Sequence, residues 1–168
     1  NPCPCGYYGD GTSFGGKDCR CSQSEVFRYQ KKISGPLLDR IDLQIEVPRV
    51  EIEQLRKKDV DYSEGEKIKK KIMRVREIQR GRLATHKLMT NSEMSSKLCD
   101  KLIHLDKSAE DFLKTVFDKS LVSARGYYRI LKVACTIADL AESETVRQEH
   151  LAEAYGYRLK EAQNVFGS

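Results

Sequence analysis

The spacing of apolar residues after Pro48 restricts the fold more than any other feature of the chain. In residues 124–141 apolar side chains recur at positions i, i+3, i+4 and i+7, which places them on one face of a helix. Ser123 precedes this segment and is a favourable N-cap. The apolar positions are Tyr127, Ile130, Leu131, Ala134, Ile137, Ala138 and Ala141. The pattern predicts a long amphipathic helix that contributes one face to a helical core.

Further helices are predicted on both sides of this segment. One begins at Ser63, with Glu66 as its capping-box partner, and runs to about Lys87, although Gly81 weakens its middle. A second is capped by Asn91 or Ser92 and reaches Ile103. The remaining helices run from Asp106 to about Lys119 and over about 147–158. The second half of the chain therefore predicts a small helical bundle.

The first half of the chain has a different character. Residues 1–22 are rich in Gly, Pro and Cys, and a short helix is predicted from Ser24 to about Lys32, broken by Ser34-Gly35-Pro36. From Ile41 to Val47 apolar residues alternate with polar ones, and Pro48 ends this pattern. Alternation of this kind is typical of a half-buried strand. The alternating residues are Ile41, Leu43, Ile45 and Val47.

We expect a mainly α chain organised in two parts. Residues 1–50 are interpreted as the end of an α/β core with a Cys-rich loop, 51–62 as a linker, 63–160 as a helical domain and 161–168 as a tail. Because the sequence begins at Asn1 without an initiator Met, we expect it to be part of a longer protein. No apolar run reaches membrane-spanning length and no signal peptide opens the sequence, which favours a cytoplasmic protein without a membrane partner.

Four of the six cysteines form two C-x-C pairs separated by thirteen residues, Cys3/Cys5 and Cys19/Cys21. Two such pairs can supply a tetrahedral shell of four thiolates, so the leading interpretation is a structural zinc site. Unligated reduced thiols and disulfides or a redox role are the alternatives, and a disulfide within C-x-C would be strained. Cys99 and Cys135 lie in helical patterns and are interpreted as core residues.

Arg40 stands between two carboxylates at the end of a short apolar run, Pro36-Leu37-Leu38-Asp39-Arg40-Ile41-Asp42-Leu43. Such an arginine is oriented in advance, with Asp39 and Asp42 as its orienting partners. A guanidinium presented rigidly at a subunit edge can neutralise charge that develops on the γ-phosphate of a neighbouring nucleotide. The competing interpretation is a surface arginine in a salt-bridged turn.

Arg125 lies in the first turn of the predicted 124–141 helix. A cation at a helix N-terminus opposes the helix dipole, and a bound phosphate would resolve this conflict because the dipole and the arginine would then act together. A solvated arginine is the alternative.

Eight basic residues occur between Lys67 and Arg82, while only Glu66 and Glu77 balance them locally. With the formal net charge of +5, this run is compatible with contact to nucleic acid, and the candidate contacts are Lys69, Lys70, Lys71 and Arg74. The commoner explanation is the solvated face of a helix whose other face carries Ile68, Ile72 and Val75.

Three separated motifs resemble the magnesium-chelatase-like AAA+ ATPases, in particular their competence-associated ComM/YifB branch. They are the segment from Asn1 to Asp10 (NPCPCGYYGD), residues 34–43 (SGPLLDRIDL), and residues 129–134 (RILKVA) with 136–140 (TIADL). The resemblance implies the C-terminal portion of an AAA+ module, with Asn1 as sensor 1, Arg40 as arginine finger and Arg125 as sensor 2 in a helical lid. It also implies ATP and Mg²⁺ in the intact protein, a homo-oligomeric ring, expected to be a hexamer, and branch migration on DNA rather than metal insertion into porphyrin.

The sequence contains no G-x-x-x-x-G-K-[ST] loop and no apolar strand that ends in acidic residues. The chain by itself is therefore not expected to hydrolyse ATP. The alternative hypothesis is a non-enzymatic, zinc-stapled helical module that binds nucleic acid or protein.

Overall fold

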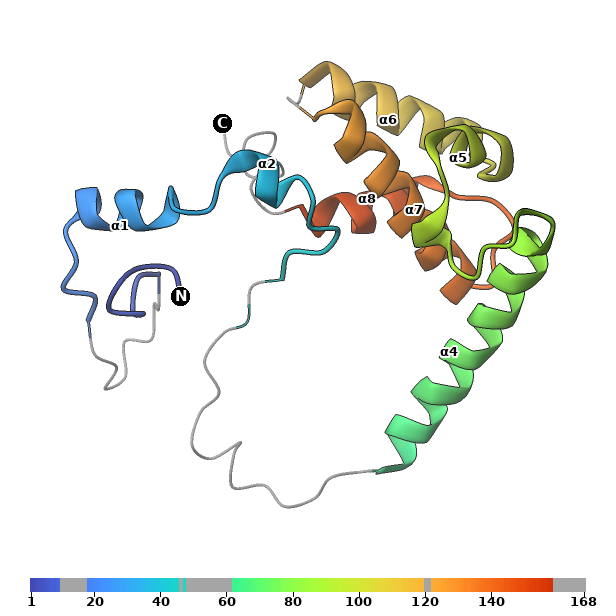
Figure 1. Ribbon diagram of the computed structural model, residues 1–168, viewed down its shortest axis with the longest axis horizontal. Helices are drawn as coiled ribbons and strands as arrows, with labels where there is room; N and C mark the ends of the chain where they lie inside the picture. The colour runs from blue at the N-terminus through green and yellow to red at the C-terminus, as the bar shows by residue number, and fades with distance from the viewer. Residues whose placement is uncertain (10–17, 46, 48–61, 120–121, 159–168) are drawn as a thin grey trace. The chain divides into compact units, whose positions relative to one another are not determined.

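The computed structural model describes residues 1–9, 18–45, 47, 62–119 and 122–158 (Figure 1). These residues form two compact units. The first holds the described residues up to Ile41, together with Val47, and the second holds Asp42–Ile45 and the described residues from Tyr62 onward. The predicted linker over 51–62, apart from Tyr62, and the predicted tail over 161–168 lie outside the described residues.

The first unit contains the cysteine-rich segment and two short helices, α1 (Gln23–Gln30) and α2 (Gly35–Leu38). Helix α1 begins one residue earlier than predicted because Ser22 and Glu25 form a capping box. The backbone N–H of Ser22 donates to Oε2 of Glu25 at 2.8 Å, and that of Glu25 donates to Oγ of Ser22 at 3.3 Å. Helix α2 is an addition to the predicted elements. Pro36 ends the preceding helix pattern but also suits the first turn of a new helix.

The strand predicted over residues 41–47 is not formed by its described residues, 41–45 and 47. A strand requires a neighbouring backbone to pair with. The backbone N–H of Gln44 instead donates to the carbonyl oxygen of Tyr157 at 2.8 Å, at the end of a helix. The alternating side chains of Ile41, Leu43, Ile45 and Val47 are all exposed.

The second unit is built from five α-helices and two 3₁₀ turns among its described residues. They are α4 (Tyr62–Leu83), η1 (Ala84–His86), η2 (Asn91–Glu93), α5 (Ser96–Leu102), α6 (Lys107–Lys119), α7 (Ala124–Leu140) and α8 (Gln148–Gly156). The mainly helical class and the helical second half are thus confirmed. None of the helices in the described ranges combines the length and the apolar character that crossing a bilayer requires.

Several helix ends follow the predicted capping residues. Ser123 accepts the N–H of Gly126 at 3.0 Å at the start of α7, and Asp106 accepts the N–H of Ala109 at 2.8 Å at the start of α6. Two predicted caps are wrong. Ser63 lies inside α4, which begins at Tyr62, and α5 is capped by Ser95 rather than by Asn91 or Ser92. The helical run that starts with α4 ends at Lys87, whose φ of 56° lies in the left-handed region and turns the chain.

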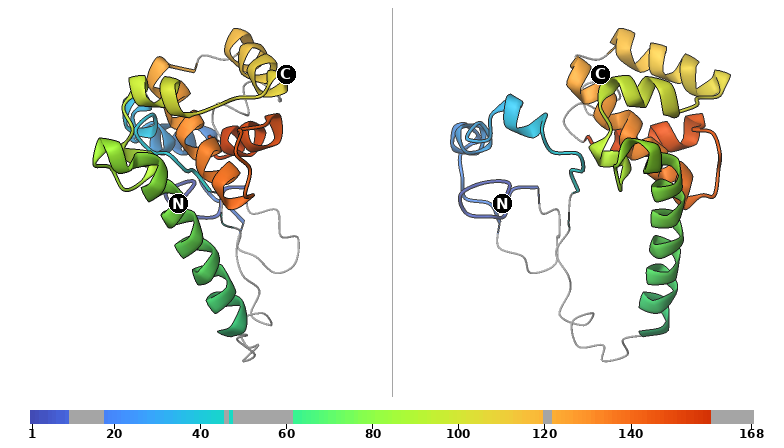
Figure 2. Two further views of the ribbon diagram at one scale, coloured as in Figure 1. Left: turned by 90° about the vertical axis from the view of Figure 1, so that its right-hand side faces the viewer. Right: turned by 45° about the vertical axis from the view of Figure 1, so that its right-hand side comes forward.

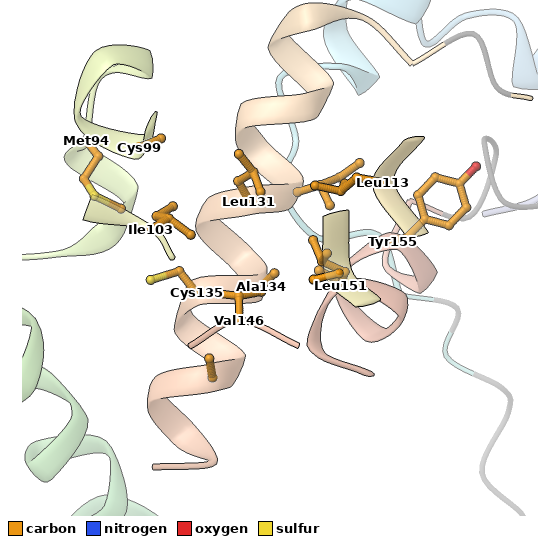
Figure 3. Packing of buried hydrophobic residues seen from close by; sticks show 14 of the residues in the cluster. Met94, Cys99, Ile103, Leu113, Leu131, Ala134, Cys135, Val146, Leu151 and Tyr155 are labelled. Atoms are coloured by element: carbon orange, nitrogen blue, oxygen red, sulfur yellow. The ribbon is translucent and has the colours of Figure 1, made fainter. Parts of the chain in front are cut away.

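Helix α7 lies at the centre of the core (Figure 3). Leu131 and Ala134 of this helix lie between Met94 and Ile103 on one side and Leu151 of α8 on the other. Cys99 and Cys135 are buried apolar-type residues, as predicted. The strand-like contact of Val146 with Leu105 secures the connection before α8, since Val146 N–H donates to the carbonyl of His104 at 2.8 Å.

Helix α4 packs on the bundle only through its C-terminal half, where Val75, Gln79 and Leu83 are buried. In both views of Figure 2 its N-terminal half extends away from α5–α8. Ile68 and Ile72, which the sequence pattern places on a covered face with Val75, are 53% and 44% exposed. The difference arises because the described residues that pack on α4 cover its C-terminal half, where Val75, Gln79 and Leu83 are buried.

Candidate functional site

A groove of about 710 Å³ runs along α7 in the second unit. One side carries three cations, Arg125, Arg129 and Lys132, and apolar residues of α7 such as Val133 and Ile137 also line it. The segment Asp42–Ile45 and the end of α8 supply further lining residues. The groove therefore combines an apolar surface with a row of positive charge, a combination typical of sites for anionic ligands with an apolar portion.

The three cations share one face of α7 because they follow one another at i, i+4 and i+7. Two of them are engaged within the unit: Lys132 donates to the carbonyl oxygen of Ser92 at 3.0 Å, and Arg129 forms an ion pair with Asp42. Arg125 is exposed, and nothing in the described part of the chain forms a hydrogen bond or ion pair with it. Arg125 is thus the cation of this row that is available to a ligand.

Arg125 is the second residue of α7, a helix of 17 residues. The positive end of the helix dipole lies at this turn, and the side chain of Ser123 satisfies the N–H of Gly126. Two sources of positive potential, the guanidinium and the dipole, therefore meet at the same end of the groove, and a phosphate bound there would interact favourably with both.

Arg129 also lines the groove. Its Nε is buried, and within the described ranges it has no hydrogen-bond partner. A buried donor without an acceptor costs about 1–3 kcal/mol. An anionic ligand, or a carboxylate elsewhere in the intact protein, would offset this cost.

Arg40 lies in the first unit, directly after α2. Its side chain is exposed, and Nη1 donates to the carbonyl oxygen of Pro36 at 3.0 Å. This bond holds the guanidinium against the end of α2. Asp42, expected to orient Arg40, instead pairs with Arg129, because Asp42 belongs to the helical unit. Asn1 is exposed, at the start of the cysteine-rich segment, and its side chain lies beside Gly6.

The four N-terminal cysteines come together in the first unit as the spacing predicts. Their Sγ atoms all lie within 4.8 Å of one another. The Cys3–Cys5, Cys3–Cys19 and Cys5–Cys19 separations are 3.3, 3.7 and 3.6 Å, and all four are free thiols. A tetrahedron with Zn–S bonds of about 2.3 Å has S–S edges of about 3.8 Å. The donor set therefore fits a tetrahedral thiolate site.

Local backbone geometry supports this cluster. Gly6 and Gly9 adopt φ values of 81° and 82°. These values lie in the left-handed region, which glycine enters without strain. The turn between Cys3 and Gly6 is closed by a backbone hydrogen bond of 3.1 Å. The backbone N–H of Tyr7 lowers the pKa of Cys5 to about 6. This sulfur is therefore available as the thiolate that binds metal.

The buried network around Asp139 has no counterpart among the sequence predictions. Its carboxylate forms a two-point ion pair with Arg82 and accepts hydrogen bonds from Gln79 at 3.1 Å and Asn91 at 2.8 Å. Hydrogen bonding to Asp139 also raises the pKa of Arg82. Arg82, counted above in the basic run, is therefore part of the packing of α4 on α7. The sequence did contain one signal for this network: Asp139 is an acidic residue next to Ala138, on the apolar face of the predicted 124–141 helix.

The basic run on α4 is largely exposed. Lys69 lies 3.8 Å from Glu66, and Arg74 lies 2.8 Å from Glu142, with every side chain of the two pairs more than half exposed. Lys70 and Lys71 are exposed. The four candidate nucleic-acid contacts thus lie on the exposed surface of α4.

The comparisons with known proteins agree with the motifs. Residues 63–158 match the family described as magnesium chelatase, subunit ChlI C-terminal, and residues 1–55 match magnesium chelatase, subunit ChlI. The chain is 37% identical over 158 residues to competence protein ComM of Haemophilus influenzae, an alignment that covers 94% of the chain and 29% of that protein. An uncharacterized protein of Mycobacterium tuberculosis is 34% identical over 161 residues, covering 94% and 30%. The uncharacterized protein YifB of Escherichia coli is 34% identical over 158 residues, covering 94% and 29%. The chain thus spans about three tenths of the length of these curated relatives.

Proposed function

The chain belongs to the magnesium chelatase subunit ChlI family, with ComM-like and YifB-like relatives, and we propose that it is the C-terminal part of an AAA+ ATPase. In this proposal the phosphate-binding loop and the acidic residues that hold Mg²⁺ belong to another part of the intact protein. This chain supplies positive charge and a lid, so that it completes an ATP site without forming one by itself.

The observation that carries the proposal is the state of Arg125, an exposed cation without a partner in the described ranges, at the N-terminus of α7 and beside the groove. We assign Arg125 the role of sensor 2, in contact with the γ-phosphate. Asn1 is assigned the role of sensor 1, and Arg40 that of the arginine finger that reaches the nucleotide of a neighbouring subunit. Preorganised cations stabilise the charge that spreads over the transferred phosphoryl group.

Replacing Arg125 by alanine in the intact protein is expected to lower kcat for ATP hydrolysis by about a hundred-fold, because a charged contact to the γ-phosphate is lost. Steady-state hydrolysis and nucleotide affinity are the measurements. Arg76→Ala is the matched control, since Arg76 is an exposed arginine on α4, outside the groove. Equal rates for the two variants would contradict the assignment of Arg125.

We further propose that the intact protein forms a homo-oligomeric ring of six subunits. This ring would use ATP to move on DNA and to promote branch migration. The net charge of +5 and the exposed cations of α4 are consistent with contact to a phosphate backbone. The name competence protein, given to the Haemophilus influenzae relative, adds support.

The alternative, a non-enzymatic module that binds nucleic acid, is favoured by one observation, the exposure of Lys69, Lys70, Lys71 and Arg74 on α4. It makes opposite predictions for the same assays. Charge reversal of the three lysines would then abolish the biological activity, and Arg125→Ala would have little effect on it.

For the cysteine cluster we propose one structural Zn²⁺ held by Cys3, Cys5, Cys19 and Cys21. Four thiolates leave no open coordination position, so the metal would stabilise the loop rather than take part in the chemistry.

Metal analysis of the protein purified without chelator is expected to find one zinc per chain. Cys19→Ser is expected to remove most of this zinc and to expose the first unit to proteolysis, because metal binding and folding of such a loop are coupled. Cys99→Ser, in the core of the helical unit, should retain the full zinc content. Zinc content that is unchanged in Cys19→Ser would contradict the assignment.

A further inference from the structure

The segment Asp42–Ile45 is bound to the helical unit by contacts of two kinds. The carboxylate of Asp42 forms an ion pair with Arg129 of α7, and the backbone N–H of Gln44 donates to the carbonyl oxygen of Tyr157 at 2.8 Å. Leu43 and Ile45 line the α7 groove beside these contacts. The segment is therefore grouped with the helical unit, although its neighbours in sequence up to Ile41 belong to the first unit.

At the α7 end of this contact, Arg129 follows Arg125 by one helical turn on the same face. A rigid helix transmits displacement between the two side chains. Asp42 is the charged partner of Arg129 within the described ranges, and the Nε of Arg129 has no acceptor there. If contact between a nucleotide and Arg125 displaced α7, Arg129 would move with the helix, and its ion pair with Asp42 would change.

At the other end of the contact, Ile41 alone separates Asp42 from Arg40 in the sequence. The guanidinium of Arg40 is held by the carbonyl of Pro36 in α2, and the backbone N–H groups of Arg40 and Ile41 donate to the carbonyl oxygens of Leu37 and Leu38 at 3.0 Å each. Arg40 and Ile41 are thus fixed to a short hydrogen-bonded turn rather than to a loose loop. Ile41, the residue that joins this turn to Asp42, is itself hydrogen-bonded within the turn.

We propose that the Asp42–Arg129 ion pair is a latch that couples the lid helix α7 to the presentation of Arg40, which makes Asp42 and Arg129 positioning residues for ATP hydrolysis. This inference rests on the proposed function, because it gives the sensor 2 helix and the arginine finger of one chain a shared element. The side chains of Arg129 and Asp42 are 27% and 46% exposed. Because the carboxylate of Asp42 is nearly half exposed, solvent screens the pair and limits its contribution to stability, so a coupling role can be separated from a structural one.

The test uses the intact protein. Steady-state ATP hydrolysis measures kcat and KM, and single-turnover hydrolysis measures the rate of the chemical step. Asp42→Asn keeps the shape of the side chain and removes its charge, and we expect kcat to fall about ten-fold, with KM changed less than about two-fold. Asp42→Glu restores the charge and should recover most of the loss. Asp100→Asn is the matched control, since Asp100 accepts a hydrogen bond of 3.2 Å from Tyr128, the neighbour of Arg129 on α7, without a link to Arg40.

The decisive readout is the dependence on Arg40. If the latch acts through the finger, Asp42→Asn produces no further loss of kcat in a protein that already carries Arg40→Ala. A further ten-fold loss in that background, an unchanged kcat in Asp42→Asn alone, or an equal loss in Asp100→Asn would overturn the latch. If Arg40→Ala itself leaves kcat unchanged, the proposed function fails, and the latch fails with it. A loss in Arg40→Ala without any in Asp42→Asn overturns the latch alone.

Discussion

If Arg40 is the arginine finger proposed above, replacing it by alanine is expected to lower kcat for ATP hydrolysis by the intact protein about a thousand-fold, at the lower end of the range for arginine fingers. We expect a large effect because an arginine finger stabilises charge that develops only in the transition state, so that its loss is not recovered by raising the ATP concentration. The fold should be retained, since Arg40 is exposed and its guanidinium bonds to a carbonyl oxygen of the adjacent turn.

The measurement is steady-state ATP hydrolysis at saturating nucleotide, together with thermal unfolding. Arg28→Ala is the matched control, because Arg28 is also an exposed arginine at the end of a short helix of the first unit. A kcat for Arg40→Ala within three-fold of the unsubstituted protein, at unchanged stability, would show that Arg40 is an ordinary surface residue.

Replacing Asp139 by alanine is expected to destabilise the helical unit by about 3–5 kcal/mol, the usual cost of removing one partner from a buried ion pair. The carboxylate side chain is 1% exposed, and its loss leaves Arg82 without its counter-charge. Gln79 and Asn91 lose a hydrogen-bond acceptor in the same change. The network joins α4 and η2 to α7, so the loss should loosen α4 first.

Amide hydrogen exchange in α4 and α7 measures this local opening free energy in the intact protein. Glu142→Ala is the control, because its pair with Arg74 is exposed. Such an exposed pair should contribute less than about 1 kcal/mol. Combining Asp139→Leu with Arg82→Met should recover much of the loss, since a buried pair can be replaced by apolar residues at little cost. Protection in α4 that is equal in Asp139→Ala and Glu142→Ala would contradict this account.

Local signals were sufficient to predict much of the fold. The capping residues Ser123 and Asp106 and the apolar face of α7 act within one or two helical turns, so they can be read without knowledge of tertiary contacts. The cysteine cluster is similar, because two C-x-C pairs on a glycine-rich loop need only a turn to meet.

The errors arose where a distant partner decides the structure. The alternation of apolar and polar residues over 41–47 is the same whether the segment pairs with a strand or lies against helices. In the structure, Asp42 contacts Arg129 and Gln44 contacts Tyr157, so the segment lies against helices. Asn91 has the composition of a cap but is used in the Asp139 network, 48 residues away. Neither partner is visible in the local pattern.

The single-turnover rate of ATP hydrolysis by the intact protein that carries Arg40→Ala and Arg125→Ala together shows whether this chain completes the ATP site. If this chain completes the ATP site, the rate falls at least about a thousand-fold. The loss should also be smaller than the product of the two single losses, because both arginines act on the same phosphoryl group. A folded double variant that hydrolyses ATP within three-fold of the unsubstituted rate would contradict the account.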